Sequence, residues 1–346
     1  MSFLLNNDLE KIVSDLNGQI DTFSGKNILI TGARGFLGRY FTDFFLLLNS
    51  KYLSKKCKVT AIDNFITAGD FGKDVSDDYT FIEHNIIKPF KKTNNFDFII
   101  HAAGIASPYY YKKFPLDALD VSTIGLRNVL DLAEKHTRVI FFSSSEIYGN
   151  PNSENVPTKE TYNGNVSCLG PRACYDESKR MGETLIQIYA ENYGVNASII
   201  RPFNVYGPGM QKYDYRVLPN FAHKILSNEK LTIYGDGSQT RTFCYVTDAI
   251  VGFMKVLIDG EAAEPYNIGN PEPEVSMLEL ISLVKKAIPE FKIEYEITDY
   301  PETYPADEPM RRCPDINKAI NKFNYNPNID LEEGLKRFFN WAKENY

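Results

Sequence analysis

The sequence predicts an α/β protein built on a Rossmann-type doubly wound parallel sheet, with a smaller mixed α/β domain that binds the substrate. Short apolar runs of the kind found in buried parallel strands recur through the first part of the chain. Helical stretches separate the later runs, and a glycine-rich turn links the first run to the first helix. These observations together favour a nucleotide-binding architecture.

The apolar runs that read as strands end at turns or loops. They are Lys26–Thr31, Lys58–Ile62, Tyr79–His84, Phe96–His101, Arg138–Phe142 and Ala197–Arg201. The helical stretches among them are Arg39–Leu48, Leu116–Lys135 and Tyr175–Tyr193. Alternation of strands and helices favours a largely parallel sheet, because parallel neighbours need a crossover connection.

The first strand leads into a GxxGxxG turn formed by Gly32, Gly35 and Gly38. Glycines at this spacing allow a tight turn and let the backbone approach a pyrophosphate, which the N–H groups of the following helix can bind. The second strand ends in Asp63, whose carboxylate can accept hydrogen bonds from a ribose and repel a 2′-phosphate. The pattern therefore predicts NAD rather than NADP, with Arg34 as the one contrary residue.

Small or polar residues follow the strands at 101–104, 143–146 and 201–204. In open α/β sheets, ligands bind beyond the carboxyl ends of the strands, so we expect the site at this edge. Tyr175 and Lys179 are four residues apart and share one face of a helix. An ammonium group beside a phenol favours the phenolate, which can act as a general base. This spacing alone is also compatible with an ordinary solvated helix face.

Beyond Phe203 the pattern is mixed, with a strand-like Leu231–Tyr234 and helical Asp248–Ile258 and Met277–Ala287. We expect a helical N-terminal extension at 1–24, an NAD-binding Rossmann domain at 25–202 with 242–270 returning to it, and a substrate-binding domain formed by 203–241 and 271–346.

The composition narrows the classes of function. The 346 residues are 43% hydrophobic, which is enough to fill the cores of two domains. A formal net charge of −7 without a basic run argues against nucleic acid. No apolar stretch reaches the roughly 18 residues that cross a bilayer, so we expect a cytoplasmic protein with no membrane partner. The 5 cysteines form no Cys-x-x-Cys pair and predict neither disulfides nor a metal site.

The sequence resembles the extended short-chain dehydrogenases/reductases that act on nucleotide sugars, the NAD-dependent epimerase/dehydratase family. It is most similar to the UDP-glucuronate decarboxylases, or UDP-xylose synthases. The matching segments are TGARGFLG, AIDNF, ASPYYY, SSSEIYG, GPRACYDESKR, RPFNVYGPGM, RVLPNF, LTIYGDGSQTRTFCYV, NIGNPE and EPMRRCPDI. GPRACYDE is far more specific than Tyr-x-x-x-Lys, whereas the glycine turn and SSSEIYG are shared with 4,6-dehydratases and 4-epimerases.

The resemblance implies a role for each matching residue. Tyr175 would remove the proton of the sugar 4-hydroxyl, with Lys179 favouring the phenolate and Ser144 hydrogen-bonding the same hydroxyl. Glu146 would position the sugar and its water, and Arg241 would lie near the substrate. The implied NAD-binding residues are Gly32, Gly35, Phe36, Leu37, Gly38, Asp63, Asn64, Asn85, Ile86, Ala102, Ala103, Tyr175, Lys179 and Arg216. The implied substrate-binding residues are Ser145, Tyr110, Asn204, Asn220, Tyr234, Arg241 and Arg311. A UDP-sugar substrate and a homodimer are also implied.

Several interpretations stay open. The decarboxylases tend to carry a lysine where this chain has Asp120, and a carboxylate there would repel a glucuronate. A nucleotide-sugar 4,6-dehydratase, in which Glu146 removes the C5 proton, and a 4-epimerase are therefore alternatives. A non-catalytic NAD-binding regulator is a further alternative, against which the intact Tyr175, Lys179 and Ser144 argue. Ser144 and Glu146 could also merely cap the end of a strand.

Overall fold

The computed structural model describes residues 4–69, 77–91, 95–300 and 309–346. Within these residues the strands are β1 (Asn27–Thr31), β2 (Lys58–Asp63), β3 (Tyr79–Glu83), β4 (Phe98–His101), β5 (Arg138–Phe142), β6 (Asn196–Pro202), β7 (Val205–Tyr206), β8 (Leu231–Tyr234), β9 (Thr240–Arg241), β10 (Cys244–Tyr245), β11 (Pro265–Ile268), β12 (Val275–Ser276), β13 (Tyr295–Thr298) and β14 (Arg311–Arg312). The α-helices are α1 (Asn6–Asp15), α2 (Phe36–Lys51), α3 (Pro108–Lys113), α4 (Pro115–Val121), α5 (Ile124–Leu130), α6 (Ala173–Tyr193), α7 (Val217–Leu226), α8 (Val246–Asp259), α9 (Met277–Ala287), α10 (Asn317–Phe323) and α11 (Leu331–Asn345). Short 3-10 helices are η1 (Gln19–Phe23), η2 (Ser145–Tyr148) and η3 (Ser153–Asn155).

The centre of the molecule is a 7-stranded sheet in the described part of the chain, with the order β11-β6-β5-β4-β1-β2-β3. Its neighbouring strands pair in parallel throughout. The strand order reverses beside β1, which has β2 on one side and β4 on the other. A cavity lies at this reversal, lined by Thr31 at the end of β1 and by Ala102 just after β4. The predicted doubly wound fold is confirmed.

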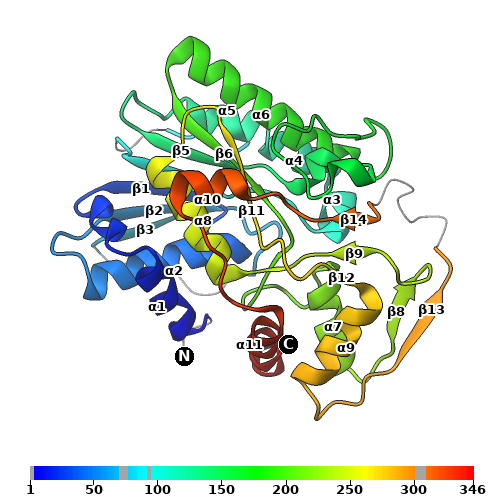
Figure 1. Cartoon of the computed structure of the whole chain (residues 1–346). Coiled ribbons are helices and arrows are strands. Elements are labelled where there is room, and N and C mark those ends of the chain that lie inside the picture. The colour runs from blue at the N-terminus through cyan, green and yellow to red at the C-terminus, as the bar shows by residue number, and fades with distance from the viewer. Residues whose placement is uncertain (1–3, 70–76, 92–94, 301–308) are drawn as a thin grey trace.

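Alternate residues of the central strands face opposite layers of helices. Ile28 and Ile30 of β1 belong to the core that includes side chains of α2 and α8, whereas Leu29 belongs to the core that includes side chains of α5 and α6. All three side chains are fully buried, as expected for a parallel sheet that is covered on both faces. Figure 1 shows α2 and α8 on one side of the sheet and α5 and α6 on the other.

Helix α1 lies against α2 and α8, and it reaches α11 through a buried carboxylate. The carboxylate of Asp8 accepts a hydrogen bond of 2.7 Å from the Tyr245 hydroxyl and forms an ion pair of 3.1 Å with Arg337. Burial raises the pKa of Asp8, and its two partners oppose that rise. The beginning of the chain is therefore fixed to two helices from its last third.

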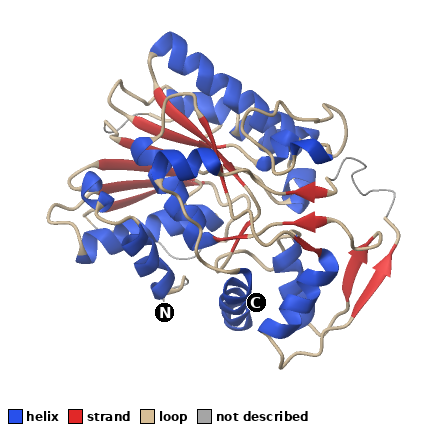
Figure 2. Ribbon diagram, in the orientation of Figure 1, coloured by secondary structure: helices blue, strands red, loops and turns tan. Residues whose placement is uncertain are grey.

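The short strands after β6 form small sheets of their own. In the described residues these are β10–β7, β12–β9–β14 and β13–β8. Figure 2 shows β8 and β13 with helices α7 and α9 in the lower right part of the molecule, away from the large sheet. Strand β11 is different, because it returns to the large sheet and pairs with β6.

The helical stretch predicted near Leu116–Lys135 is helical, but it is interrupted once and ends earlier than expected. The chain forms α4 and α5 instead, which are separated at Ser122 and Thr123 and end at Leu130. The Thr123 hydroxyl donates a hydrogen bond of 2.9 Å to the Leu119 carbonyl, so the side chain competes with the helical hydrogen bonds at this point. The other predicted strands and helices lie within a few residues of the observed ones.

Candidate active site

Tyr175 lies in the first turn of α6, and its side chain is buried beside Ser144 at the end of β5. Its ring stacks on Tyr111 with 5.7 Å between centroids, and its hydroxyl is hydrogen-bonded to Ser144. Burial raises the pKa of Tyr175, while the Ser144 hydrogen bond and the positive charges of Arg216 and Arg172 act to lower it. The phenol is thus held in one place with cations near it, as a general base requires.

Lys179 is one turn further along α6, and it is almost completely buried. Its ammonium donates a hydrogen bond of 2.8 Å to the Phe142 carbonyl and lies 5.6 Å from the centre of the Tyr175 ring. Burial lowers the pKa of Lys179 to about 7. The two residues therefore share one helix face as expected, although the protonated form of the lysine is itself costly at this depth.

The residues around the cavity at the strand reversal are of the kind that bind a dinucleotide. Gly32 has a φ of 69°, and a Cβ at this residue would lie 2.6 Å from the backbone of Ala103. A Cβ on Gly38 would collide with the Gly32 carbonyl oxygen. The glycines therefore bring the start of α2 close to β4, where its N–H groups can face a pyrophosphate. Predicted residues that line this cavity are Gly32, Gly35, Asp63, Asn64, Asn85, Ile86, Ala102 and Ala103.

Asp63 is at the end of β2, where a ribose would be expected. Its carboxylate accepts hydrogen bonds of 2.8 Å from the backbone N–H groups of Arg34 and Phe65. These bonds fix the carboxylate at the edge of the cavity. The guanidinium of Arg34 lies over the Phe81 ring at 4.6 Å from its centre. Phe36 and Leu37 begin α2 and pack against the core rather than lining the cavity described above.

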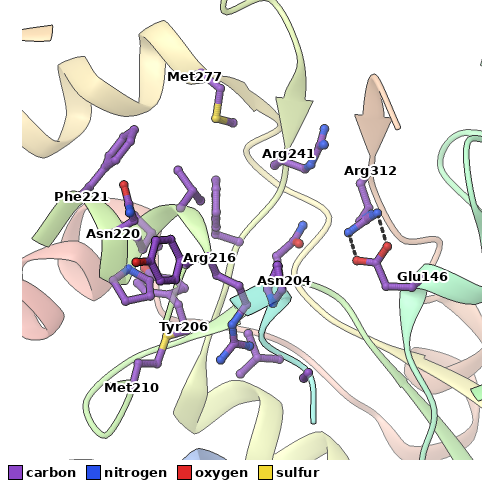
Figure 3. A pocket seen from close by; sticks show the side chains of 18 of the residues that line it. Glu146, Asn204, Tyr206, Met210, Arg216, Asn220, Phe221, Arg241, Met277 and Arg312 are labelled. Carbon is purple, nitrogen blue, oxygen red and sulfur yellow. Dashed lines mark hydrogen bonds and ion pairs between the residues drawn. The ribbon is translucent and has the colours of Figure 1, made fainter. Parts of the chain in front are cut away.

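A second cavity of about 480 Å³ lies between the ends of the central strands and the small sheets. Figure 3 shows Arg241 and Asn204 on one side of Asn220 and Phe221, with Glu146 and Arg312 beyond them. Predicted residues that line this cavity are Glu146, Tyr175, Asn204, Arg216, Asn220, Tyr234 and Arg241. The structure thus brings residues from η2, α6, α7, β8 and β9 to one space.

Glu146 is bound by two arginines from distant parts of the chain. Its carboxylate forms ion pairs with Arg172, just before α6, and with Arg312 of β14. A second N–H of Arg312 donates to the other carboxylate oxygen at 2.7 Å, so this pair is bidentate (Figure 3). Arginine N–H groups therefore occupy both carboxylate oxygens, and a substrate proton would have to compete with them for Glu146.

Arg312 and Arg172 were not predicted as site residues, and Arg311 was. The structure places Arg311 outside the lining of the cavity: its side chain is 43% exposed and bound to Glu274 at 2.7 Å. Arg312, with a side chain only 9% exposed, points into the cavity instead. Neighbouring residues of a strand face opposite sides, so only one of the two arginines could do so.

Some residues that were predicted to face the substrate do not line the larger cavity, and nearby residues line it instead. Tyr110 and Ser145 are not among the described residues that line the cavity, whereas Tyr111 is. The Tyr110 hydroxyl instead donates to Gln211 at 3.5 Å. Asp120, which was expected to face the substrate, lines neither of the two cavities in the described part of the chain. The exposed Lys112 of α3 lines the larger one.

The described residues contain no group of His, Cys, Asp and Glu side chains suited to a metal ion. In the same parts of the chain, every helix is too short or too polar to pass through a membrane.

Comparisons with known proteins agree with this geometry. Residues 28–269 match the model of the NAD dependent epimerase/dehydratase family. UDP-glucuronic acid decarboxylase 1 of Arabidopsis thaliana is 39% identical over 319 residues, which cover 90% of this chain and 68% of that protein. UDP-glucuronic acid decarboxylase 1 of Danio rerio is 39% identical over 316 residues, covering 90% of this chain and 71% of that protein.

Solved structures share the fold. A dTDP-glucose 4,6-dehydratase from Streptomyces venezuelae with NAD and TYD bound has a TM-score of 0.79 and 23% identity, covering 92% of this chain and 97% of that one. A variant of UDP-glucuronic acid 4-epimerase from Bacillus cereus, in complex with UDP-4-deoxy-4-fluoro-glucuronic acid and NAD, has a TM-score of 0.74 and 26% identity, covering 92% of this chain and 100% of that one. With its glycine turn, its Tyr175–Lys179 pair and these relatives, the chain belongs to the NAD-dependent epimerase/dehydratase family.

Proposed function

We propose that this enzyme is a UDP-glucuronate decarboxylase that forms UDP-xylose through a 4-keto intermediate. The observation that carries the proposal is the pair of guanidinium groups, Arg172 and Arg312, which meet at a carboxylate beside the buried Tyr175. A guanidinium group has five N–H donors and is the side chain best suited to bind carboxylates, so a uronic acid can share these two arginines with Glu146. The names of the relatives at 37–39% identity support the same reaction.

The residues of the site suit each step of this reaction. Tyr175 takes the proton from the sugar 4-hydroxyl, and Ser144 hydrogen-bonds the same oxygen. NAD, when bound, supplies the acceptor for the C4 hydride and later returns that hydride. The C6 carboxylate is then β to the C4 ketone, so the C5–C6 bond breaks as CO2 leaves and its electrons move toward the ketone oxygen. The residues near Glu146 hold the sugar and the water that protonates C5.

A 4,6-dehydratase would use the same oxidation but would need Glu146 as a free base at C5. Both oxygens of Glu146 are engaged by arginines, including a bidentate contact with Arg312, so a C5 proton would compete with these N–H groups for the carboxylate. This arrangement favours a positioning role for the carboxylate over proton removal. It is the reason that we place decarboxylation ahead of dehydration.

The test is a product analysis in heavy water with catalytic amounts of NAD. UDP-glucuronate should give a product lighter by one CO2 that carries one deuterium at C5, and Tyr175→Phe should give almost none. UDP-glucose should remain unchanged. Loss of water from UDP-glucose, with no CO2 released from UDP-glucuronate, would contradict the proposal and favour the dehydratase.

We also propose the domain roles and the partner. Residues 203–241 and 271–346 supply Asn220, Tyr234 and Arg312 to the larger cavity, which supports their role as the nucleotide-sugar-binding domain. The outer face of α6 carries the exposed apolar side chains of Met181 and Ile188, seven residues apart and so on one side of the helix. We infer that this face contacts a second copy of the chain.

The oligomer can be measured by sedimentation. Met181→Lys, at a residue that is 52% exposed, should convert a dimer to a monomer because it places a charge in the proposed contact. Ile320→Lys on α10, at a residue that is 40% exposed, is the matched control and should leave the dimer intact. A wild-type monomer, or equal effects of the two variants, would exclude this face as the contact.

A further inference from the structure

Asn267 of β11 is fully buried and uses every hydrogen-bonding atom of its side chain. Its amide oxygen accepts from the Tyr148 hydroxyl at 2.8 Å. Its amide nitrogen donates to the carbonyls of Thr158 at 2.9 Å and Asp315 at 3.0 Å. Asn267 is not among the described residues that line either cavity, so its side chain acts on the surrounding protein.

Two of the three groups bound by this amide, Tyr148 and Asp315, belong to the segments that carry the Glu146–Arg312 pair. Tyr148 is the last residue of η2, the same short helix that contains Glu146. Asp315 follows Arg312 by three residues. The segment after β14 is also bound to Thr158, because Thr158 N–H donates to the Cys313 carbonyl at 2.9 Å and Asp315 N–H donates to the Thr158 carbonyl at 2.9 Å.

The same chain of contacts continues to the end of β5. The Tyr148 hydroxyl accepts a hydrogen bond of 2.8 Å from Arg201. Arg201 is paired with Glu183 at 2.6 Å, and the Ser143 hydroxyl donates to Glu183 at 2.5 Å. Ser143 immediately precedes Ser144, which is hydrogen-bonded to Tyr175. One buried network therefore connects the end of β5, next to the Ser144 that contacts the proposed base, with the segment that holds Arg312.

We propose that Asn267 is a positioning residue, which sets the place of Arg312 relative to Glu146 by binding the two segments at once. This inference rests on the proposed role of that ion pair in holding the sugar. An amide suits the position because it offers two donors to two carbonyls and one acceptor to a hydroxyl. An aspartate would instead present an oxygen to the carbonyls of Thr158 and Asp315, and both would lose the hydrogen bond from Asn267, while the Asp315 N–H would still donate to the Thr158 carbonyl.

The mildest perturbation of the network is Tyr148→Phe, which removes only the hydroxyl that Asn267 accepts from. Tyr325→Phe is a matched control, because Tyr325 is equally buried and its hydroxyl donates to the Gly269 carbonyl at 3.2 Å. Among the described residues, this hydroxyl forms no hydrogen bond with η2 or with the segment after β14. Both variants should lower the melting temperature. Only Tyr148→Phe should lower kcat, by about 10- to 100-fold with KM little changed, because small displacements of positioned groups act on turnover.

A double-mutant cycle separates positioning from a general loss of stability. Tyr148→Phe or Asn267→Asp is combined with Arg312→Lys, and kcat for UDP-glucuronate is measured with each protein fully folded. If Asn267 acts through Arg312, adding Tyr148→Phe or Asn267→Asp to the Arg312→Lys protein should lower kcat by less than about threefold. The inference would be overturned if the fold-losses in kcat of the two single variants multiplied in the double variant, or if Tyr325→Phe lowered kcat as much as Tyr148→Phe. Neither outcome would affect the proposed function.

The single variants show which proposal has failed. If Arg312→Lys and Glu146→Gln alone keep the wild-type kcat, the ion pair has no role in turnover, and both the inference and the proposed use of the pair fall. If the wild-type protein does not release CO2, the function itself is wrong, which the product analysis reports independently of any variant.

Discussion

Replacing Lys179 by methionine is expected to stabilise the folded protein while abolishing its activity. The ammonium is almost fully buried, and burial lowers its pKa from 10.5 to about 7. Below about pH 7 the folded protein carries the whole cost of this charge, because the lysine is protonated in both the folded and the unfolded states. At about 1.36 kcal/mol per pKa unit, the shift corresponds to a cost of at most ~5 kcal/mol.

Removing the buried charge should stabilise the folded protein, but losing the hydrogen bond from Lys179 to the Phe142 carbonyl offsets part of that stabilisation. Methionine leaves that carbonyl without its donor, which costs about 1–3 kcal/mol. We therefore expect Lys179→Met to raise the free energy of unfolding by about 2–4 kcal/mol below neutral pH. Between about pH 7 and pH 10.5 only the unfolded lysine keeps its proton, so the wild type becomes more stable as the pH rises.

The difference in free energy of unfolding between Lys179→Met and the wild type should consequently decrease by about 3 kcal/mol between about pH 7 and about pH 9. Urea unfolding of the nucleotide-free proteins at several pH values in this range measures the difference. Lys255→Met is the control, because the Lys255 ammonium also donates to a backbone carbonyl, at 2.9 Å, but its side chain is only partly buried. A stability difference that does not change with pH, or a less stable Lys179→Met at acidic pH, would refute this reasoning.

Two further changes test the base and a buried carboxylate. Tyr175→Phe should lower kcat by about 10²- to 10⁴-fold with little change in KM. Loss of the Ser144 hydrogen bond in this variant should lower the free energy of unfolding by only about 1 kcal/mol. Near-normal turnover would exclude Tyr175 as the base. Burial raises the pKa of Asp248 from 3.8 to about 6, so wild-type stability is lost as the pH rises through this interval. Asp248→Asn keeps the acceptor for the backbone N–H groups of Asn328 and Ile329, and urea unfolding should show a gain of up to ~3 kcal/mol at neutral pH and none near pH 4.

Local sequence patterns were sufficient to predict the strands and helices at the centre of the fold. The apolar run before Gly32 forms β1, and the glycine turn leads into α2, because hydrophobic periodicity and a positive φ are properties of a few consecutive residues. Tyr175 and Lys179 are likewise placed by the geometry of one helix. Their surroundings were harder to predict: Arg172 and Arg216 are the cations that act on the Tyr175 hydroxyl, and they come from outside the helix face.

The choice between Arg311 and Arg312 could not be made from spacing. Strand β14 has only two residues, and its pairing with β9, which sets Arg312 opposite Arg241, decides which side chain enters the cavity. That register depends on tertiary contacts between segments about 70 residues apart. The break between α4 and α5 has a different origin, because a single threonine hydroxyl competes with the helix at a point where the apolar periodicity continues.

The attachment of α1 bears on the order in which the protein folds during synthesis. Asp8 leaves the ribosome early, but Tyr245, which binds it, is made 237 residues later, and Arg337 is made later still. Until then α2 can cover only part of the apolar face of α1, and a helix of 10 residues is marginal on its own. Docking of α1 is therefore a late event that requires α8 and α11, and protection of its amide protons from exchange marks the completion of folding.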